Sequence, residues 1–119
     1  MSHPFTLVDV FGTDPFTGNA LAVIAQAEPL SAEEMQRITR WLNLAETTFL
    51  LAPTHPDADY RVRIFSRSHE LPFAGHPTLG TCHAWLEAGG TPKRSGSVVQ
   101  ECGAGLVTVR QDGAGLAFA

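Results

Sequence analysis

The chain has 119 residues, the size of one domain, which can bury about two-thirds of the surface its unfolded form exposes. A hydrophobic content of 44% argues against disorder, and the net charge of −4, with no basic run longer than Lys93-Arg94, argues against a nucleic-acid partner. The first residues lack the pattern of a secretory signal, and no apolar run approaches the roughly 20 residues of a membrane helix. Two cysteines, Cys82 and Cys102, are too few for a disulfide framework. These features predict a single domain, residues 1–119, in a cytoplasmic protein with no membrane contact.

Strands and helices are predicted in the order ββαββαβββ. Alternating or strand-forming residues place the strands at about residues 5–11, 20–25, 46–51, 60–64, 97–101, 106–111 and 116–119. The first helix follows Ser31, which can form a capping box with Glu34. Its apolar residues recur at helical spacing: Met35, Ile38, Trp41 and Leu42. This pattern is typical of an amphipathic helix on the outside of a fold.

The second helix is predicted from Pro77 to about residue 86, with Gly89-Gly90 as its stop. Residues 78–86 contain no Asp, Glu, Lys or Arg, and a helix without a polar face is usually surrounded by protein. We therefore expect His83 in the core. A strongly bent sheet would hide this helix and limit exposed edges. The predicted fold is α+β, with a curled, mostly antiparallel sheet wrapped around a central buried helix.

The segment that leads into this second helix is the first candidate site. Gly75 lets the backbone approach a ligand closely, and a helix amino terminus favours anions. Small side chains around Gly75 and His76 leave room for a carboxylate. The alternative is a tight strand-to-helix turn in which His76 acts only as a cap.

Two further residues are candidates for chemistry. Glu46 begins an apolar strand, and a carboxylate with apolar neighbours is a candidate general base because desolvation raises the pKa of such a group. The alternative is an ordinary solvated glutamate. Asn19 either donates to a ligand or holds the turn before it. The five histidines lack the spacing of a zinc site, and Gly103-Ala-Gly105 lacks the setting of a dinucleotide fingerprint, so no metal or cofactor is predicted.

Five segments together carry a family resemblance, in one order and spacing. They are Val8-Asp-Val-Phe11, Pro15-Phe-Thr-Gly-Asn19, Asn43-Leu-Ala-Glu-Thr-Thr-Phe49, Tyr60-Arg-Val-Arg-Ile-Phe65 and Glu70-Leu-Pro-Phe-Ala-Gly-His-Pro-Thr-Leu-Gly80. With them the chain resembles the amino-terminal half of PhzF-like isomerases of phenazine biosynthesis. The resemblance implies a diaminopimelate-epimerase-like fold, in which two similar halves, each a curled sheet around a helix, enclose the active site between them.

The resemblance also implies a function. Glu46 matches the family glutamate that moves a proton between carbons of a small unsaturated carboxylic acid, with no metal or cofactor. Gly75 and His76 match the positions that hold the substrate carboxylate. The family substrate is trans-2,3-dihydro-3-hydroxyanthranilate. Epimerases and racemases of the same fold use two cysteines, and the first of these positions is Ala74 here, which disfavours that second alternative.

Family members are more than twice as long as this chain, and the carboxy-terminal half is missing from it. The resemblance therefore implies a partner, either a second copy related by a two-fold axis or a complementary carboxy-terminal half. The alternatives are a non-catalytic half-domain that binds a small acid or serves as an oligomeric module, and an inactive truncated product.

Overall fold

The structure is a computed structural model, and it describes residues 4–10, 18–112 and 115–118. The elements are β1 (Phe5–Val10), β2 (Asn19–Ile24), α1 (Ala32–Leu42), β3 (Glu46–Leu51), β4 (Tyr60–Ser66), β5 (Glu70–Leu71), α2 (Gly75–Glu87), β6 (Ser97–Cys102), β7 (Gly105–Asp112) and β8 (Gly115–Phe118). The predicted order is confirmed except for β5, whose two residues are too few to give a periodic signal. Within the described residues, no helix is long and apolar enough to cross a membrane.

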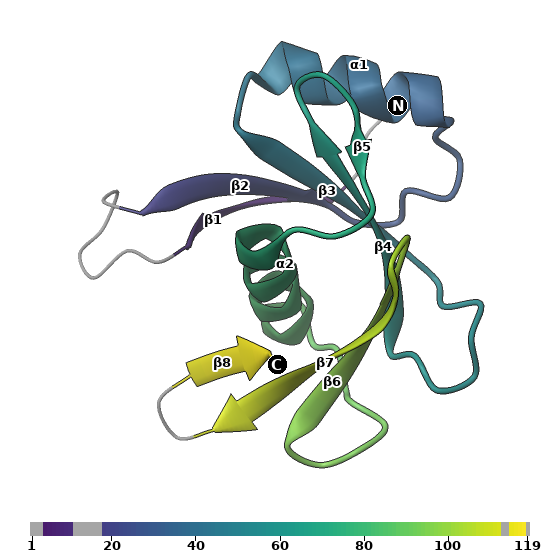
Figure 1. The fold of residues 1–119 in the computed structure, drawn as a ribbon, viewed down its shortest axis with the longest axis vertical. Helices are drawn as coiled ribbons and strands as arrows, with labels where there is room; N and C mark the ends of the chain where they lie inside the picture. Colours follow the sequence, from purple (N-terminus) through teal and green to yellow (C-terminus); the bar gives the residue numbers. More distant parts are fainter. Residues whose placement is uncertain (1–3, 11–17, 113–114, 119) are drawn as a thin grey trace.

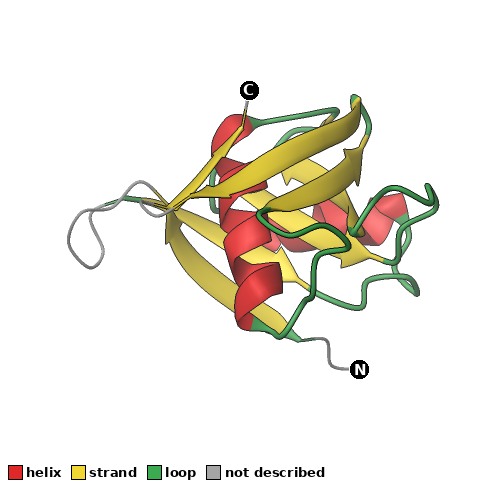
Figure 2. Cartoon of the chain, turned by 90° about the horizontal axis from the view of Figure 1, so that it is seen from below, coloured by secondary structure: helices red, strands yellow, loops and turns green. Residues whose placement is uncertain are grey.

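One eight-stranded sheet connects all the strands, in the order β1-β2-β3-β4-β6-β7-β8, with β5 paired to β4. The β2–β3 and β4–β6 pairs are parallel, and the other pairs are antiparallel. The sheet bends so that both of its wings lie against α2 (Figures 1 and 2). The predicted α+β fold with a curled sheet around a central helix is therefore confirmed.

Helix α1 covers the outer face of the sheet, beside β3 and β4. Its capping box forms as predicted, because the Ser31 hydroxyl accepts from the Glu34 N–H and the Glu34 carboxylate accepts from the Ser31 N–H. Met35 packs with Phe49 in the smaller of two apolar clusters. Trp41 shares the helical spacing of the apolar residues, yet 82% of its surface is exposed.

Helix α2 begins at Gly75, two residues before the predicted start. Pro77 is its third residue, a position whose N–H has no intrahelical acceptor in any helix. Proline therefore marked the first turn of the helix correctly, but the helix begins two residues earlier than predicted. The buried residues of α2 are Pro77, Thr78, Gly80, Thr81, Cys82 and Ala84. One hydrogen bond in this core joins the hydroxyls of Thr48 and Thr81 at 2.7 Å.

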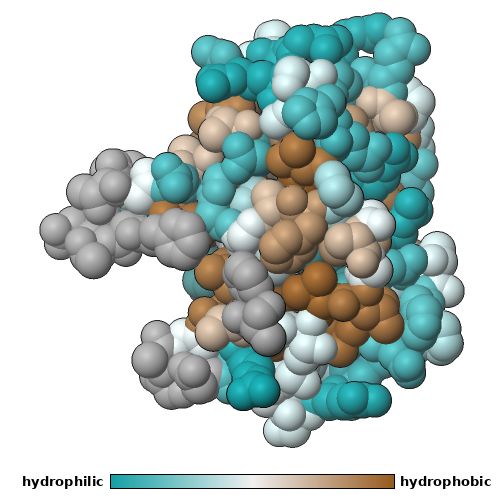
Figure 3. All heavy atoms as spheres, in the orientation of Figure 1, coloured by the Kyte–Doolittle hydropathy of each residue, from teal (hydrophilic) through white to brown (hydrophobic). Residues whose placement is uncertain are grey.

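One side of α2 stays open, because β1 and β8 are the two ends of the sheet path and do not pair with each other in the described residues. His83 is exposed on this side and lies 3.5 Å from the Glu87 carboxylate, so its expected place in the core is wrong. On the face drawn in Figure 3, apolar atoms gather over α2 and the strands next to it.

Candidate active site

Glu46 is the first residue of β3, and the sheet determines the direction of its side chain. Residue 48 on the same strand bonds to α2, and Leu50 belongs to the cluster packed around α2. Successive side chains of a strand alternate between faces, so Glu46 also faces α2. The strand register sets Glu46 opposite Leu21 of β2 and Ser66 of β4. The sheet thus holds this carboxylate on its inner face, at one end of β3.

The Glu46 carboxylate meets His76 from the first turn of α2. The His76 Nδ1 and Glu46 Oε1 atoms are 3.0 Å apart, and the two side chains are 14% and 18% exposed. An ionised carboxylate can only accept hydrogen bonds, so Nδ1 would need to carry a proton to donate to it. The pair is therefore largely withdrawn from bulk water, with a small part of each side chain still exposed. The reading of His76 as a simple cap is wrong, because Ala74 is the N-cap residue and makes no side-chain cap bond.

Gly75 is the first residue of α2, directly before His76. The first turn of α2 contains no acidic side chain of its own, and a helix amino terminus carries partial positive charge. The N–H groups of a first helical turn have no intrahelical acceptors. Glu46, Gly75 and His76 are therefore brought to one place, where a carboxylate ligand and a proton-transferring group can meet.

Asn19 lies near this place by register rather than by contact. It is the first residue of β2 and is exposed. It lies two residues before Leu21, the partner of Glu46, and so belongs to the same face of the sheet. Residues 11–17 of its turn lie outside the described residues, so its turn-holding role stays a prediction.

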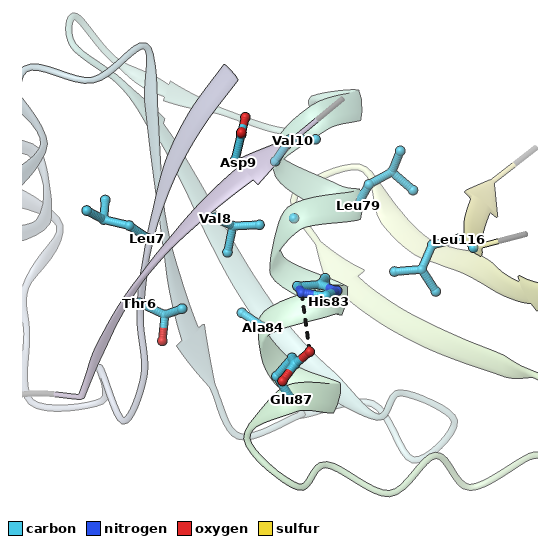
Figure 4. Close-up of a pocket in the computed structure, with 12 residues that line it drawn as sticks. Thr6, Leu7, Val8, Asp9, Val10, Leu79, His83, Ala84, Glu87 and Leu116 are labelled. Atoms are coloured by element: carbon cyan, nitrogen blue, oxygen red, sulfur yellow. Dashed lines mark ion pairs between the residues drawn. The ribbon is translucent and has the colours of Figure 1, made fainter. Parts of the chain in front are cut away.

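A separate groove lies on the open side of α2 (Figure 4). It has a volume of about 640 Å³ and does not include Glu46 or His76. Val8 and Val10 line it from β1, Leu79 from α2 and Leu116 from β8. Its polar groups are mainly Asp9 and the His83–Glu87 pair. The sequence interpretation missed this groove, because it depends on the two ends of the sheet staying apart.

Neither thiol is arranged as an acid or base. Cys82 is fully buried, and burial raises the pKa of its thiol to about 11, so the thiol stays protonated at neutral pH. Cys102 lies on β6, where its thiol donates to the Gly105 carbonyl. In the described part of the chain, no three His, Cys, Asp or Glu side chains are grouped to hold a metal ion.

Comparison with known proteins identifies relatives. Residues 8–117 match the family described as phenazine biosynthesis-like protein. The chain is 50% identical over 111 residues to antisense-enhancing sequence 1 of Schizosaccharomyces pombe. This match covers 93% of the chain and 38% of the yeast protein. It is 49% identical over 82 residues to trans-2,3-dihydro-3-hydroxyanthranilate isomerase of Pseudomonas aeruginosa, covering 69% of the chain and 29% of the isomerase.

Solved structures of the same family also resemble this chain. A PhzF-family phenazine biosynthesis protein of Bacillus anthracis superimposes with a TM-score of 0.84 at 30% identity, covering 99% of this chain and 40% of that one. A probable proline racemase of Agrobacterium radiobacter, at 22% identity and a TM-score of 0.63, shares the fold. The chain spans about two-fifths or less of the length of these relatives. The chain belongs to the PhzF family of phenazine biosynthesis-like proteins and corresponds to the amino-terminal half of its members.

Proposed function

We propose that this chain is the base-carrying half of a PhzF-type isomerase that moves a proton between two carbons of a small unsaturated carboxylic acid. The observation that carries the proposal is the 3.0 Å contact between Glu46 and His76 at the start of α2. The dihydrohydroxyanthranilate isomerases among its relatives support the reaction class.

In the proposed reaction, ionised Glu46 removes a proton from carbon and then, as the acid, returns it to another carbon of the same substrate. His76 packs its Nδ1 atom 3.0 Å from the Glu46 carboxylate and so keeps that side chain oriented at the helix start. The backbone at Gly75 and the positive end of α2 hold the substrate carboxylate or the charge that develops near it. Asn19 is a further candidate contact to substrate, because it belongs to the same face of the sheet.

The proposal needs a second half to close the site. The chain spans less than two-fifths of the P. aeruginosa isomerase. We propose that a second copy of this chain, or a separate carboxy-terminal half, supplies the other wall. Native mass spectrometry at micromolar concentration tests this, with a dimer or a two-chain complex as the expected result and a strict monomer as the result against it.

The catalytic test is turnover of trans-2,3-dihydro-3-hydroxyanthranilate by the assembled protein. Glu46→Gln keeps the size of the side chain but removes its basicity, so kcat should fall at least about 100-fold, the usual contribution of a general acid or base. Glu87→Gln is the matched control, since Glu87 also faces a histidine of α2 at 3.5 Å but lies outside the proposed site.

Equal activity of the wild-type protein and Glu46→Gln would refute the catalytic role of Glu46. Loss of turnover in Glu87→Gln alone would move the chemistry to the open groove. An assembled wild-type protein that binds the acid but does not convert it would favour the second candidate, a non-catalytic module that binds small acids. The short span of the chain relative to its relatives is the observation that favours that candidate.

A further inference from the structure

A chain of buried polar side chains runs from the sheet to the start of α2. Tyr60, Gln100 and Thr78 are 2%, 0% and 0% exposed. The Tyr60 hydroxyl donates to the Gln100 Oε1 atom at 3.1 Å, and the Gln100 Nε2 atom donates to the Thr78 hydroxyl at 3.2 Å. The Thr78 hydroxyl donates in turn to the carbonyl of Ala74 at 2.8 Å. The last acceptor is the N-cap residue of α2, directly before Gly75.

The direction of these three hydrogen bonds follows from counting the protons available to each group. The Thr78 hydroxyl has one proton, which the Ala74 carbonyl accepts, so toward Gln100 this hydroxyl can only accept. The nitrogen of the Gln100 amide must therefore face Thr78, and its oxygen must face Tyr60. Burial raises the pKa of the Tyr60 hydroxyl well above its ordinary value, which keeps this group a donor. All three bonds point the same way, an arrangement in which each strengthens the next.

Strand pairing and ring packing hold Tyr60 and Gln100, the end of the hydrogen-bond series that lies away from α2. Tyr60 of β4 and Gln100 of β6 are direct partners in the parallel register. The Tyr60 ring also packs against Trp85 of α2, with ring centroids 5.4 Å apart. The network therefore starts from a paired and packed part of the sheet and ends at the helix start.

The geometry of the Ala74–Gly75 peptide links these hydrogen bonds to the candidate active site. The carbonyl of Ala74 and the N–H of Gly75 belong to one planar trans peptide and point in opposite directions. The Ala74 carbonyl accepts from both the N–H and the hydroxyl of Thr78, so it points into the helix. The Gly75 N–H then points out of the helix start. Gly75 itself has no Cβ to restrict the rotation of this peptide.

We propose that Gln100 is a positioning residue that holds the Ala74–Gly75 peptide in the orientation that binds the substrate carboxylate. The proposal rests on the proposed function for its ligand, but the peptide orientation can be measured without one. The role is indirect, because the side chain of Gln100 lies entirely inside the core.

The test is NMR of the 119-residue chain with Gln100→Met, which keeps the side-chain length but removes both hydrogen bonds. Thr81→Val is the matched control, because it removes the equally buried Thr48–Thr81 bond from the same helix without touching Ala74. In the free protein, the Gly75 amide should show new microsecond-to-millisecond exchange in Gln100→Met and should match the wild type in Thr81→Val. Equal Gly75 behaviour in the two variants would overturn the proposal.

Binding of 2-aminobenzoate is the second readout. If the competent peptide orientation falls to about a tenth of the population, the apparent Kd should rise about tenfold in Gln100→Met and stay unchanged in Thr81→Val. A wild-type chain that does not bind this acid would count against the proposed function, while the Gly75 amide still decides the positioning role. If Gln100→Met does not fold, Tyr60→Phe should show the same change at Gly75 to a smaller extent, and its absence would refute the role.

Discussion

Substituting Gly80 tests how closely the sheet encloses α2. A Cβ atom at this residue would lie 2.5 Å from Cδ2 of Leu21 and 2.8 Å from Cγ2 of Val10, which are 0% and 6% exposed. Overpacking of this kind costs about 1–3 kcal/mol, and the better helix propensity of alanine offsets about 1 kcal/mol of it. We expect Gly80→Ala to lower the free energy of unfolding by up to about 2 kcal/mol, where each kcal/mol lowers the melting temperature of a small domain by about 4–8 °C.

Urea denaturation of a double-mutant cycle gives the sharper result. Leu21→Ala alone should cost about 2–5 kcal/mol, because it leaves a cavity where the leucine was. In that background the methyl group of Gly80→Ala occupies part of the cavity, so the double variant should be more stable than the sum of the single costs by at least about 1 kcal/mol. Additive costs, or a Gly80→Ala variant more stable than the wild type, would refute the close contact between α2 and β2.

Two further predictions concern titratable groups. The Arg63 guanidinium donates two hydrogen bonds to Glu70 and lowers the pKa of that carboxyl from its ordinary 4.5. The pair is partly exposed, so loss of the pairing in Arg63→Met should cost less than about 1 kcal/mol above pH 4.5. This part of the cost should vanish as the pH falls through the lowered pKa of Glu70, while the loss of the Arg63 contact with the Phe65 ring does not depend on that pKa. A cost that is the same at pH 7 and pH 2 in urea titrations would contradict the pairing. Iodoacetamide at pH 8 should modify Cys102 first and leave Cys82 intact until the chain unfolds, because the thiol of Cys82 is buried and has a pKa of about 11. Early modification of Cys82, detected by mass spectrometry, would contradict its burial.

The elements that sequence patterns predict well here are those whose signals are local. Ser31 and Glu34 lie three residues apart, and their capping box forms as expected. The absence of charge in residues 78–86 predicts a helix inside the sheet, and α2 has this place. His83 was placed wrongly in the core, because its exposure depends on where the sheet ends. The exposure of Trp41 likewise depends on which strands meet α1, and helical spacing predicts neither of these arrangements.

In the candidate site, too, the residues could be predicted from local sequence but their contacts could not. Glu46 and Gly75-His76 could each be named from neighbouring residues and from the family resemblance. Their contact could not, because it depends on the β3 register and on the two-residue earlier start of α2. The link from Gln100 to Ala74 was missed entirely, since Gln100 in an apolar strand gives no signal until a partner 22 residues away in sequence faces it.

The most direct test is to ask which of two histidines of α2 responds to a small ring carboxylate. His76 reports on the Glu46 site and His83 reports on the 640 Å³ groove. In histidine ring NMR spectra of the chain titrated with 2-aminobenzoate, we expect the His76 signals to shift in a saturable manner while the His83 signals stay in place. A saturable shift of His83 alone, or no saturable shift of His76, would contradict the placement of the active site at Glu46, Gly75 and His76.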